Sequence, residues 1–275
     1  MHSFCVRILT FVRLVTDVVR IVNTRTDHIA AFAKGLKVIA CFGADRSRLS
    51  IAEVATLTGL DRATARRCLL TLHNEGYADY DGKFFKLTPR VLRLGLGALA
   101  AMPLAQIVQP WLDQLSDQVG QSSSVSILDE TEIVYLARAA QRRVMSIGLM
   151  PGSRLPCHCT SMGRVLLAAL PEAEARALLD RSDLTPRTVH SLTDPAAIME
   201  AIAEVRAQGH CVIDQEIELG LRSIAVPVMS VRGQVVAALN IGAAAVQSEP
   251  ADLVRLYLPQ MMKMQAGLRR VLGQG

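Results

Sequence analysis

The most reactive combination of side chains in the sequence is the run Cys157-His158-Cys159. A zinc site would need a fourth ligand and usually a wider spacing of its cysteines, and His210 and Cys211 could complete one only through tertiary folding. A catalytic Cys–His pair needs its base to face the nucleophile, and adjacency in one segment does not provide that. We therefore favour a structural loop at the mouth of a pocket. A metal- or thiol-redox-responsive protein and a small-molecule enzyme with a DNA-tethering domain remain as alternatives.

Motifs of the common enzyme classes are absent from the sequence. It contains no GxxxxGK[ST], HExxH or GxSxG pattern and no CxxC pair. The run from Gly95 to Ala100 fits GxGxxA, but it follows a predicted helix rather than a strand, so it fails the context that a dinucleotide site requires. We predict that the chain is not an enzyme, with no catalytic residue, no cofactor and no metal ligand.

A second group of polar residues suits a small anion. The run Thr160-Ser161-Met162-Gly163 opens a predicted helix, whose free N–H groups and positive dipole end favour a carboxylate, although Thr160 could equally be a simple cap. Asp214 and Glu216 end one predicted strand, and Arg222-Ser223 precede the next. Asn240 interrupts an apolar strand, where its amide either bonds to the backbone or lines a pocket. These residues together predict a pocket for a small organic acid.

Basic residues gather on a third predicted element, a helix that begins after Asp61. Arg62 and Arg66 lie one turn apart and could both face the major groove of B-DNA, while Arg67 suits a phosphate. An ordinary solvated face is the alternative. Further basic residues, which could contact the DNA backbone, lie on a predicted wing and linker at Lys83, Lys86, Arg90 and Arg93. The predicted DNA-binding residues are Ser50, Arg62, Ala63, Thr64, Arg66, Arg67, Lys83 and Lys86.

The distribution of charge supports a nucleic-acid partner. The 275 residues carry a net charge of +5, but residues 1–101 hold 15 lysines and arginines against 8 aspartates and glutamates. The remaining residues hold 15 against 17. A basic first third joined to a mildly acidic remainder indicates that only the first part meets a polyanion.

Composition excludes other classes of protein. Hydrophobic residues make up 51% of the chain and charged residues 20%, which indicates a folded chain. No apolar run reaches the ~20 residues of a membrane span, since Asn240 interrupts the longest one, Val235–Val246. The six scattered cysteines, without a secretory signal, predict free thiols and a cytoplasmic protein.

The elements that carry the basic residues predict a winged helix-turn-helix. Apolar residues at helical spacing predict a helix over Asp27–Gly43, through Ile29, Phe32, Leu36, Ile39 and Ala40. Ser50 with Glu53 forms a capping-box pattern that opens a second helix, and Asp61 caps a third that runs to about Glu75. Tyr77–Leu87 alternates around Asp81-Gly82, which predicts a hairpin.

The rest of the chain predicts a linker and a mixed domain. Val91–Ala101 is a predicted linker helix, followed by a helix that ends near Gly120. Strands in two groups with helices between them predict an α+β fold. The predicted strands are Ser122–Leu128, Glu132–Ala139, Val144–Leu149, Cys211–Asp214, Ile224–Ser230 and Val235–Gly242, with Pro151–Cys159 as a loop and helices from about Thr160, Glu172, Asp194 and Glu249. The predicted divisions are a poorly ordered extension 1–26, a DNA-binding domain 27–88, a linker helix 89–102 and an effector-binding domain 103–273.

Several runs of residues give this sequence a resemblance to IclR-type transcriptional regulators. The match covers about residues 28–272 and keeps order and spacing. It rests on Leu49-Ser-Ile-Ala-Glu-Val-Ala-Thr-Leu-Thr-Gly-Leu60, Leu155-Pro-Cys-His-Cys-Thr-Ser-Met-Gly-Arg-Val-Leu-Leu-Ala168, Gln208-Gly-His-Cys-Val-Ile-Asp-Gln-Glu216 and Leu219-Gly-Leu-Arg-Ser-Ile-Ala-Val-Pro227. Within the family, Asp61-Arg-Ala-Thr-Ala-Arg-Arg67, Leu87-Thr-Pro-Arg-Val-Leu-Arg-Leu-Gly95 and Ser122-Ser-Ser-Val-Ser126 resemble the regulators of protocatechuate, 4-hydroxybenzoate and β-ketoadipate catabolism.

The resemblance implies a GAF-like effector-binding domain and a small carboxylate effector that alters transcription. It also implies homodimers or dimers of dimers on palindromic promoter sites in double-stranded DNA. The pocket positions of the family fall on Ser161, Met162, Asp214, Ser223, Asn240 and Gly242. Cys157 and Cys159 depart from the alanine or aromatic residues of relatives.

Overall fold

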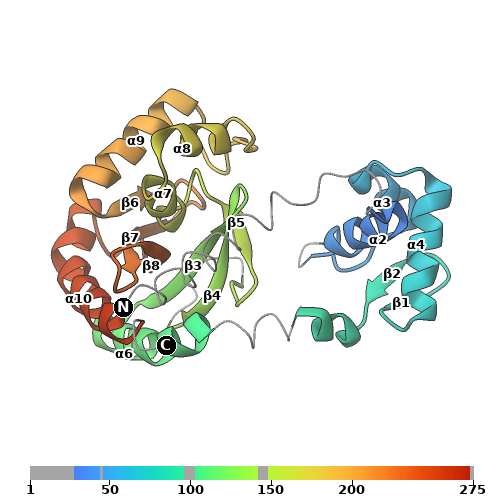
Figure 1. Ribbon diagram of the computed structural model, residues 1–275, viewed down its shortest axis with the longest axis horizontal. Helices are drawn as coiled ribbons and strands as arrows, with labels where there is room; N and C mark the ends of the chain where they lie inside the picture. Colours follow the sequence, from blue (N-terminus) through green and yellow to red (C-terminus); the bar gives the residue numbers. More distant parts are fainter. Residues whose placement is uncertain (1–27, 44–45, 96–102, 142–147, 273–275) are drawn as a thin grey trace, which may run out of the picture. The chain divides into compact units, whose positions relative to one another are not determined.

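A computed structural model describes residues 28–43, 46–95, 103–141 and 148–272. The chain divides into two compact units, Met1–Gly97 and Ala98–Gly275, here called the N-terminal and C-terminal units (Figure 1). The predicted extension 1–26 lies outside the described residues. So does much of the predicted linker helix, of which only the 3-10 turn η1 (Pro89–Val91) and helical backbone at Leu92–Gly95 are described.

The described residues of the N-terminal unit form three helices and a two-stranded hairpin, which confirms the predicted winged helix. The elements are α2 (Ala30–Ala40), α3 (Ile51–Thr58), α4 (Arg62–Asn74), β1 (Ala78–Tyr80) and β2 (Phe85–Leu87). Their core contains Val54, Leu69 and Phe85, all fully buried. Burial of these side chains holds the short elements together, because none is long enough to be stable alone.

Local side-chain contacts set the starts and turns of these elements. Ser50 and Glu53 form the predicted capping box at the start of α3, and the Asp61 carboxylate accepts from the Thr64 N–H at 2.8 Å at the start of α4. In the hairpin turn, the Asp81 carboxylate accepts from the backbone N–H groups of the two residues at 83 and 84. Gly82 there adopts a φ of +96°, which glycine tolerates best.

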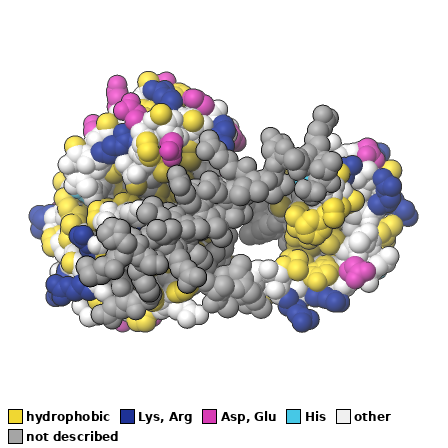
Figure 2. All heavy atoms as spheres, in the orientation of Figure 1, with side chains coloured by type: hydrophobic (Ala, Val, Ile, Leu, Met, Phe, Trp, Pro, Cys, Tyr) yellow, Lys and Arg dark blue, Asp and Glu magenta, His cyan; other side chains and the backbone are white. Residues whose placement is uncertain are grey.

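The first helix is shorter than predicted and buries a different residue. It covers Ala30–Ala40 rather than Asp27–Gly43, and Val38 is its fully buried residue. Of the predicted stripe, Ile29, Phe32 and Leu36 are 72%, 67% and 49% exposed, and Figure 2 shows hydrophobic side chains gathered over α2. The small core needs only the C-terminal half of α2, so helical spacing alone did not identify the buried face.

The C-terminal unit is a six-stranded antiparallel sheet between two layers of helices, which confirms the predicted α+β class. The sheet order is β5-β4-β3-β8-β7-β6. Helices α6 and α10 cover one face, and α7, α8 and α9 cover the other (Figure 1). The elements are α6 (Pro103–Val119), β3 (Ser122–Asp129), β4 (Glu132–Ala139), β5 (Arg154–Pro156), α7 (Ser161–Ala168), α8 (Glu172–Leu179), α9 (Pro195–Gln208), β6 (Cys211–Asp214), β7 (Leu221–Met229), β8 (Val235–Ala244) and α10 (Pro250–Val271).

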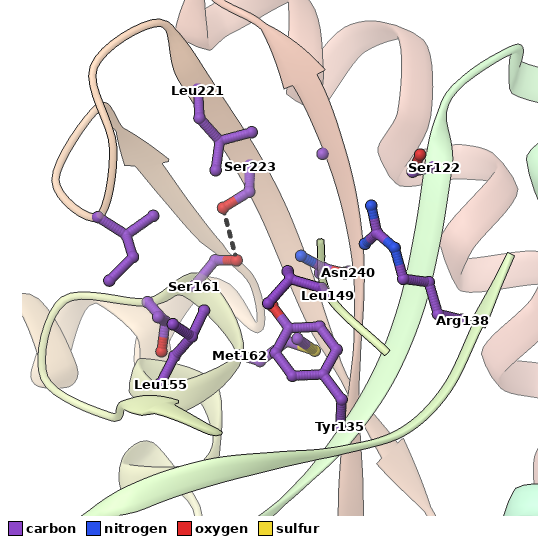
Figure 3. Close-up of a pocket in the computed structure, with 13 residues that line it drawn as sticks. Ser122, Tyr135, Arg138, Leu149, Leu155, Ser161, Met162, Leu221, Ser223 and Asn240 are labelled. Atoms are coloured by element: carbon purple, nitrogen blue, oxygen red, sulfur yellow. Dashed lines mark hydrogen bonds between the residues drawn. The ribbon is translucent and has the colours of Figure 1, made fainter. Parts of the chain in front are cut away.

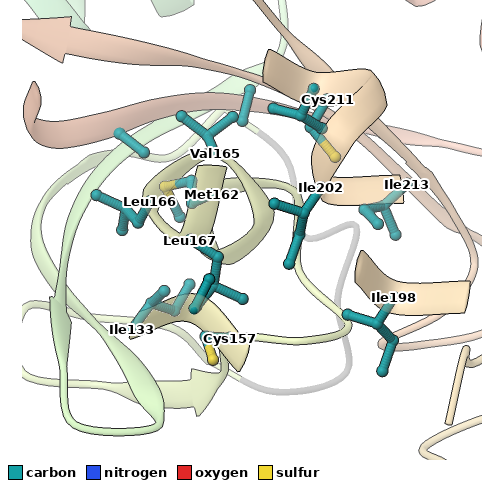
Figure 4. Close-up of a cluster of buried hydrophobic side chains, with 14 of the residues drawn as sticks. Ile133, Cys157, Met162, Val165, Leu166, Leu167, Ile198, Ile202, Cys211 and Ile213 are labelled. Carbon is teal, nitrogen blue, oxygen red and sulfur yellow. The ribbon is translucent and has the colours of Figure 1, made fainter. Parts of the chain in front are cut away.

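A separate hydrophobic core supports each face of the sheet. Under α7 and α9, Met162, Leu167, Ile198 and Ile202 are buried against the sheet (Figure 4). On the opposite face, α6 packs against β3 and β4, and α10 packs against β6 and β7. The α7 helix therefore lies on the sheet with its first residues fixed, which makes its N-terminus a rigid part of any site there.

Two predictions of strands were wrong in detail. The predicted loop Pro151–Cys159 contains β5, which pairs with β4, and β7 begins at Leu221 rather than Ile224. For the predicted strand Val144–Leu149, residues 142–147 lie outside the described residues, and Leu149 is not in a strand. Strand pairing, rather than hydrophobic alternation, decides that the polar residues at the start of β7 belong to the sheet.

In the described part of the chain, no helix is both long enough and apolar enough to cross a membrane.

Candidate effector pocket and nucleic-acid interface

The exposed face of α4 carries the predicted basic residues. Arg62, Ala63, Arg66 and Arg67 are all exposed, and Figure 2 shows Lys and Arg side chains over this helix. Thr64 is buried instead, and its hydroxyl accepts from the Arg67 guanidinium at 3.1 Å. Thr64 thus positions Arg67 and does not itself face solvent.

The other predicted DNA-binding residues lie at the start of α3 and on the hairpin. The Ser50 hydroxyl is engaged with Glu53 at 2.6 Å, so its role in the free protein is to cap α3. Lys83 and Lys86 are exposed on the hairpin, and the Lys83 ammonium lies 5.0 Å from the centre of the Phe84 ring. These two lysines are free to meet a phosphate backbone beside α4.

Five of the six predicted effector-binding residues line one pocket in the C-terminal unit (Figure 3). Ser161 and Met162 come from α7, Ser223 from β7, and Asn240 and Gly242 from β8. The Ser161 and Ser223 hydroxyls lie 2.8 Å apart. These residues come from three distant parts of the chain, and the packing of α7 on the sheet brings them together.

The N-terminus of α7 opens into this pocket. The Thr160 hydroxyl accepts from the Gly163 N–H at 3.2 Å and donates to the Pro156 carbonyl at 3.0 Å, so Thr160 is a cap as well as a lining residue. The N–H groups of Ser161 and Met162 have no acceptor within the helix, because they belong to its first turn. They are available to a carboxylate in the pocket.

Asp214 does not line the pocket. Its carboxylate accepts from Arg222 Nε at 2.6 Å, and this guanidinium lowers the pKa of Asp214 below its ordinary value. Arg222 also donates to the carbonyls of Ala245 and Ser248 at 2.9 and 2.6 Å. The pair fixes the end of β6 against β7 and the start of α10, so the position implied by the resemblance is structural here.

Sequence reasoning missed most of the wall that β3 and β4 contribute. The lining residues that it missed are Ser122, Tyr135, Arg138, Leu149, Leu155, Ile217 and Leu221. Arg138 is the one ionised side chain of the wall within the described residues. A basic residue near the end of a run of apolar and aromatic residues, 133–139, was the available signal.

A β-bulge explains why the strand pattern concealed Arg138. Val125 pairs with Ala137, but the next residue of β3, Ser126, pairs with Tyr135. Leu136 is therefore an extra residue, which turns Tyr135 and Ala137 to opposite faces of the sheet. With strict alternation Tyr135 and Arg138 would face opposite sides, whereas the bulge aims both into the pocket.

Asn240 lies at the centre of the wall, between Ser124 of β3 and Ala225 of β7. Its side-chain oxygen is buried and has no hydrogen-bond partner among the described residues. A buried polar atom without a partner is costly, so a ligand or water is expected to satisfy it. The prediction left open whether Asn240 bonds to the backbone or lines a pocket, and the structure favours the pocket.

The Cys157-His158-Cys159 run is buried beside the pocket and does not line it. Burial raises the pKa of the Cys157 and Cys159 thiols to about 12 and 11, so neither is a thiolate at neutral pH. Both ring nitrogens of His158 are without a hydrogen-bond partner in the described part of the chain. Also within those residues, no group of three or more His, Cys, Asp or Glu side chains could hold a metal.

The burial of His158 predicts a loss of stability in mild acid. Burial, with Arg164 and Arg187 nearby, lowers the pKa of His158 from 6.5 to about 4. Between these values the unfolded chain binds a proton that the folded chain does not, so the free energy of unfolding falls as the pH falls. We expect this residue to contribute a loss of about 2 kcal/mol between pH 7 and pH 5. Denaturant unfolding at both pH values measures it, and a His158→Leu variant should lack that part of the loss. An unchanged pH dependence in the variant would contradict the assignment.

A buried ion pair fixes the other side of α7. Arg164 Nη2 lies 2.6 Å from a Glu216 carboxylate oxygen, and both side chains are less than 10% exposed. The same oxygen accepts from the Leu192 N–H at 3.0 Å, and Arg164 Nε donates to the His158 carbonyl at 3.0 Å. The pair therefore joins α7 to the loops before α9 and after β6.

Both halves of the chain match descriptions of one protein family. Residues 31–82 match the IclR helix-turn-helix domain, and residues 96–264 match the bacterial transcriptional regulator IclR C-terminal domain. These matches confirm the resemblance drawn from the motifs, and they agree with the prediction that the chain is a regulator rather than an enzyme. They do not favour the metal, redox or enzyme alternatives.

Individual relatives agree with the family matches. The chain is 44% identical over 237 residues to the Pca regulon regulatory protein of Pseudomonas putida, covering 86% of this chain and 81% of that protein. It is 37% identical over 251 residues to the p-hydroxybenzoate hydroxylase transcriptional activator of Acinetobacter baylyi, covering 90% and 93%. A solved structure of the PobR inducer-binding domain from Acinetobacter, a double mutant in complex with 3-hydroxybenzoic acid, matches with a TM-score of 0.58 and 32% identity, covering 61% of this chain and 98% of that one.

Proposed function

The chain belongs to the IclR family of DNA-binding bacterial transcriptional regulators, and we propose that it controls genes of aromatic-acid catabolism in response to a small carboxylate effector. Its relatives in Pseudomonas putida and Acinetobacter baylyi regulate the Pca regulon and p-hydroxybenzoate hydroxylase by name. Protocatechuate, 4-hydroxybenzoate and β-ketoadipate are the first effectors to test.

The observation that carries the proposal is the charge of the pocket. Its described lining contains the Arg138 guanidinium and the free N–H groups at the start of α7, but no carboxylate. Both features favour an anion. Met162, Leu149 and Leu155 supply apolar surface, which suits the carbon skeleton of an organic acid. In this proposal Ser161, Met162, Ser223, Asn240 and Gly242 contact the effector, and Asp214 does not.

The proposed mechanism couples the effector-binding domain, residues 103–273, to the DNA-binding domain, residues 27–88, through the linker helix 89–102. The protein acts in the cytoplasm as a homodimer or dimer of dimers on a palindromic promoter site. Effector binding favours one arrangement of the subunits and thereby changes the spacing of the recognition helices. The effector can shift the balance between the arrangements only as far as it binds one arrangement more tightly than the other.

Fluorescence anisotropy on DNA from upstream of this gene and its neighbours tests the proposal. We expect saturable, sequence-preferring binding across a salt series, altered by one of the three acids. Reciprocity requires that the acid also binds with a different affinity when operator DNA is present. Binding that is indifferent to DNA sequence and to every acid would overturn the proposal.

Substitutions on α4 and the wing should separate specificity from affinity. Arg66→Ala should cost about 1–3 kcal/mol of operator binding and relax the sequence preference, because an exposed arginine on the recognition helix reads base edges. Lys83→Ala should weaken binding to all sequences alike and lower the salt slope by about one. Normal operator binding by Arg66→Ala would show that the recognition face lies elsewhere.

A further inference from the structure

Arg48 is a basic residue that the fold places beside the turn of the hairpin. It precedes α3 and lies 33 positions before Asp81 in the chain. The next residue, Leu49, exchanges backbone hydrogen bonds with Phe85 of β2, at 3.0 and 2.8 Å. This bridge joins the segment before α3 to the edge of the hairpin. Arg48 therefore belongs to the same surface as the turn, and its side chain is 58% exposed.

Arg48, Lys83 and Asp81 meet around one aromatic ring at the tip of the hairpin. The Arg48 guanidinium lies 5.1 Å from the centre of the Phe84 ring, and the Lys83 ammonium lies 5.0 Å from it. The face of an aromatic ring attracts cations. Arg48 Nη2 also forms an ion pair with Asp81 Oδ2. Two cations are thus held at the tip, and one carboxylate offsets part of their charge.

The two carboxylate oxygens of Asp81 have separate partners. Oδ1 accepts from the backbone N–H groups of Lys83 and Phe84, at 3.0 and 2.7 Å, and so shapes the turn. Oδ2 pairs with Arg48. These hydrogen bonds, followed by the nearby guanidinium, lower the pKa of Asp81, so the group is ionised at neutral pH. The turn needs one oxygen acceptor, which an asparagine would also supply, so it does not need the negative charge.

Stability does not explain the charge either. Both partners of the Arg48–Asp81 pair are about half exposed, and exposed ion pairs contribute little to the free energy of unfolding. The carboxylate of Glu53, at the start of α3, accepts from the N–H and the hydroxyl of Ser50 at 2.7 and 2.6 Å. Glu53 is therefore engaged as a cap, and within the described ranges Asp81 is the carboxylate that pairs with Arg48. A phosphate at the hairpin would compete with it for the guanidinium.

We propose that Arg48 contacts the DNA backbone and that Asp81 weakens this contact by holding the guanidinium, so that the hairpin binds DNA less tightly than its cations allow. Phosphate contacts supply most of the affinity for non-specific DNA. Restraint of one such contact leaves a larger share of the binding free energy to base contacts from α4. The inference depends on the proposed function, since it assumes that α4 and the hairpin lie against DNA.

Fluorescence anisotropy on the full chain tests the inference with two labelled duplexes, one from upstream of this gene and one of the same composition in shuffled order. Arg48→Gln should weaken binding to both by about 3-fold or more at about 0.1 M salt, and should lower the salt slope by about one for each bound protomer. Asp81→Asn keeps the acceptor of the turn and frees the guanidinium. It should strengthen binding to both duplexes by a similar factor and raise the salt slope.

A double variant separates release of Arg48 from a general change in charge. In Arg48→Gln/Asp81→Asn there is no guanidinium to release, so the gain produced by Asp81→Asn should be absent. Arg154→Gln and Asp129→Asn are the matched controls, because these residues form an exposed arginine–aspartate pair in the C-terminal unit. They make the same changes in net charge and should leave DNA affinity unchanged. Arg48→Lys keeps the charge and should retain most of the affinity, and thermal unfolding by circular dichroism checks that each variant is folded.

The outcomes separate this inference from the function on which it depends. Unchanged DNA binding by Arg48→Gln, with weaker binding by Lys83→Ala, would overturn the contact at Arg48 and leave the hairpin as a DNA-binding element. A gain from Asp81→Asn that persists in the double variant would overturn the restraint of Arg48 by Asp81. Unchanged binding by the variants of Arg48, Lys83 and Arg66 alike would overturn both the inference and the proposed DNA-binding face.

Discussion

Replacing Glu216 by alanine is expected to destabilise the C-terminal unit by about 3–5 kcal/mol, because it leaves the buried Arg164 guanidinium without its carboxylate. The Leu192 N–H loses its acceptor in the same change. The protein has a single tryptophan, Trp111 on α6, so tryptophan fluorescence during denaturant unfolding reports on this unit alone.

Two controls distinguish a buried-charge effect from the general loss of a salt bridge. Asp129→Ala removes a carboxylate from the exposed Arg154 pair and should cost less than about 1 kcal/mol. The double variant Arg164→Met/Glu216→Leu removes both buried charges and should recover most of the lost stability. A loss below about 1 kcal/mol for Glu216→Ala would show that water or another group compensates Arg164.

Replacing Gly163 by alanine is expected to have an effect of similar size and to reduce effector binding as well. A Cβ atom at Gly163 would lie 2.1 Å from the Cys157 carbonyl oxygen and 2.5 Å from the Cys157 Cα. Because these are backbone atoms, the start of α7 must move away from the preceding loop. We expect a loss of more than about 2 kcal/mol in the free energy of unfolding, as overpacking of a core produces, measured by Trp111 fluorescence, together with weaker effector binding by calorimetry.

Gly35→Ala is the matched control for this substitution. Gly35 also lies in a helix, α2, but a Cβ atom there would meet no atom within 4 Å. Alanine should therefore leave stability unchanged or raise it by up to about 1 kcal/mol, since glycine is the poorer helix former. If Gly163→Ala behaved like Gly35→Ala, the close approach of α7 to the loop would not be a constraint on the pocket.

Features that depend on residues close together in the chain could be predicted from the sequence. The capping box of Ser50 and Glu53, the cap at Asp61 and the cap of α7 at Thr160 each involve contacts within three residues. The hairpin at Asp81-Gly82 has the same local origin. These signals located the winged helix and the start of α7, and with them the exposed arginines of α4 and the free N–H groups that suit a carboxylate.

Only the tertiary structure decided which polar residues share the pocket. Arg138 and Tyr135 face it together because Leu136 is an extra residue in β4, and that bulge follows from pairing with β3 rather than from the sequence of β4. Asp214 does not line the pocket, because its carboxylate forms an ion pair with Arg222 on a neighbouring strand. Sequence pattern determines which elements form and how they begin, because those interactions are local; the register and partners of strands, which are distant in the chain, determine where each charged side chain points.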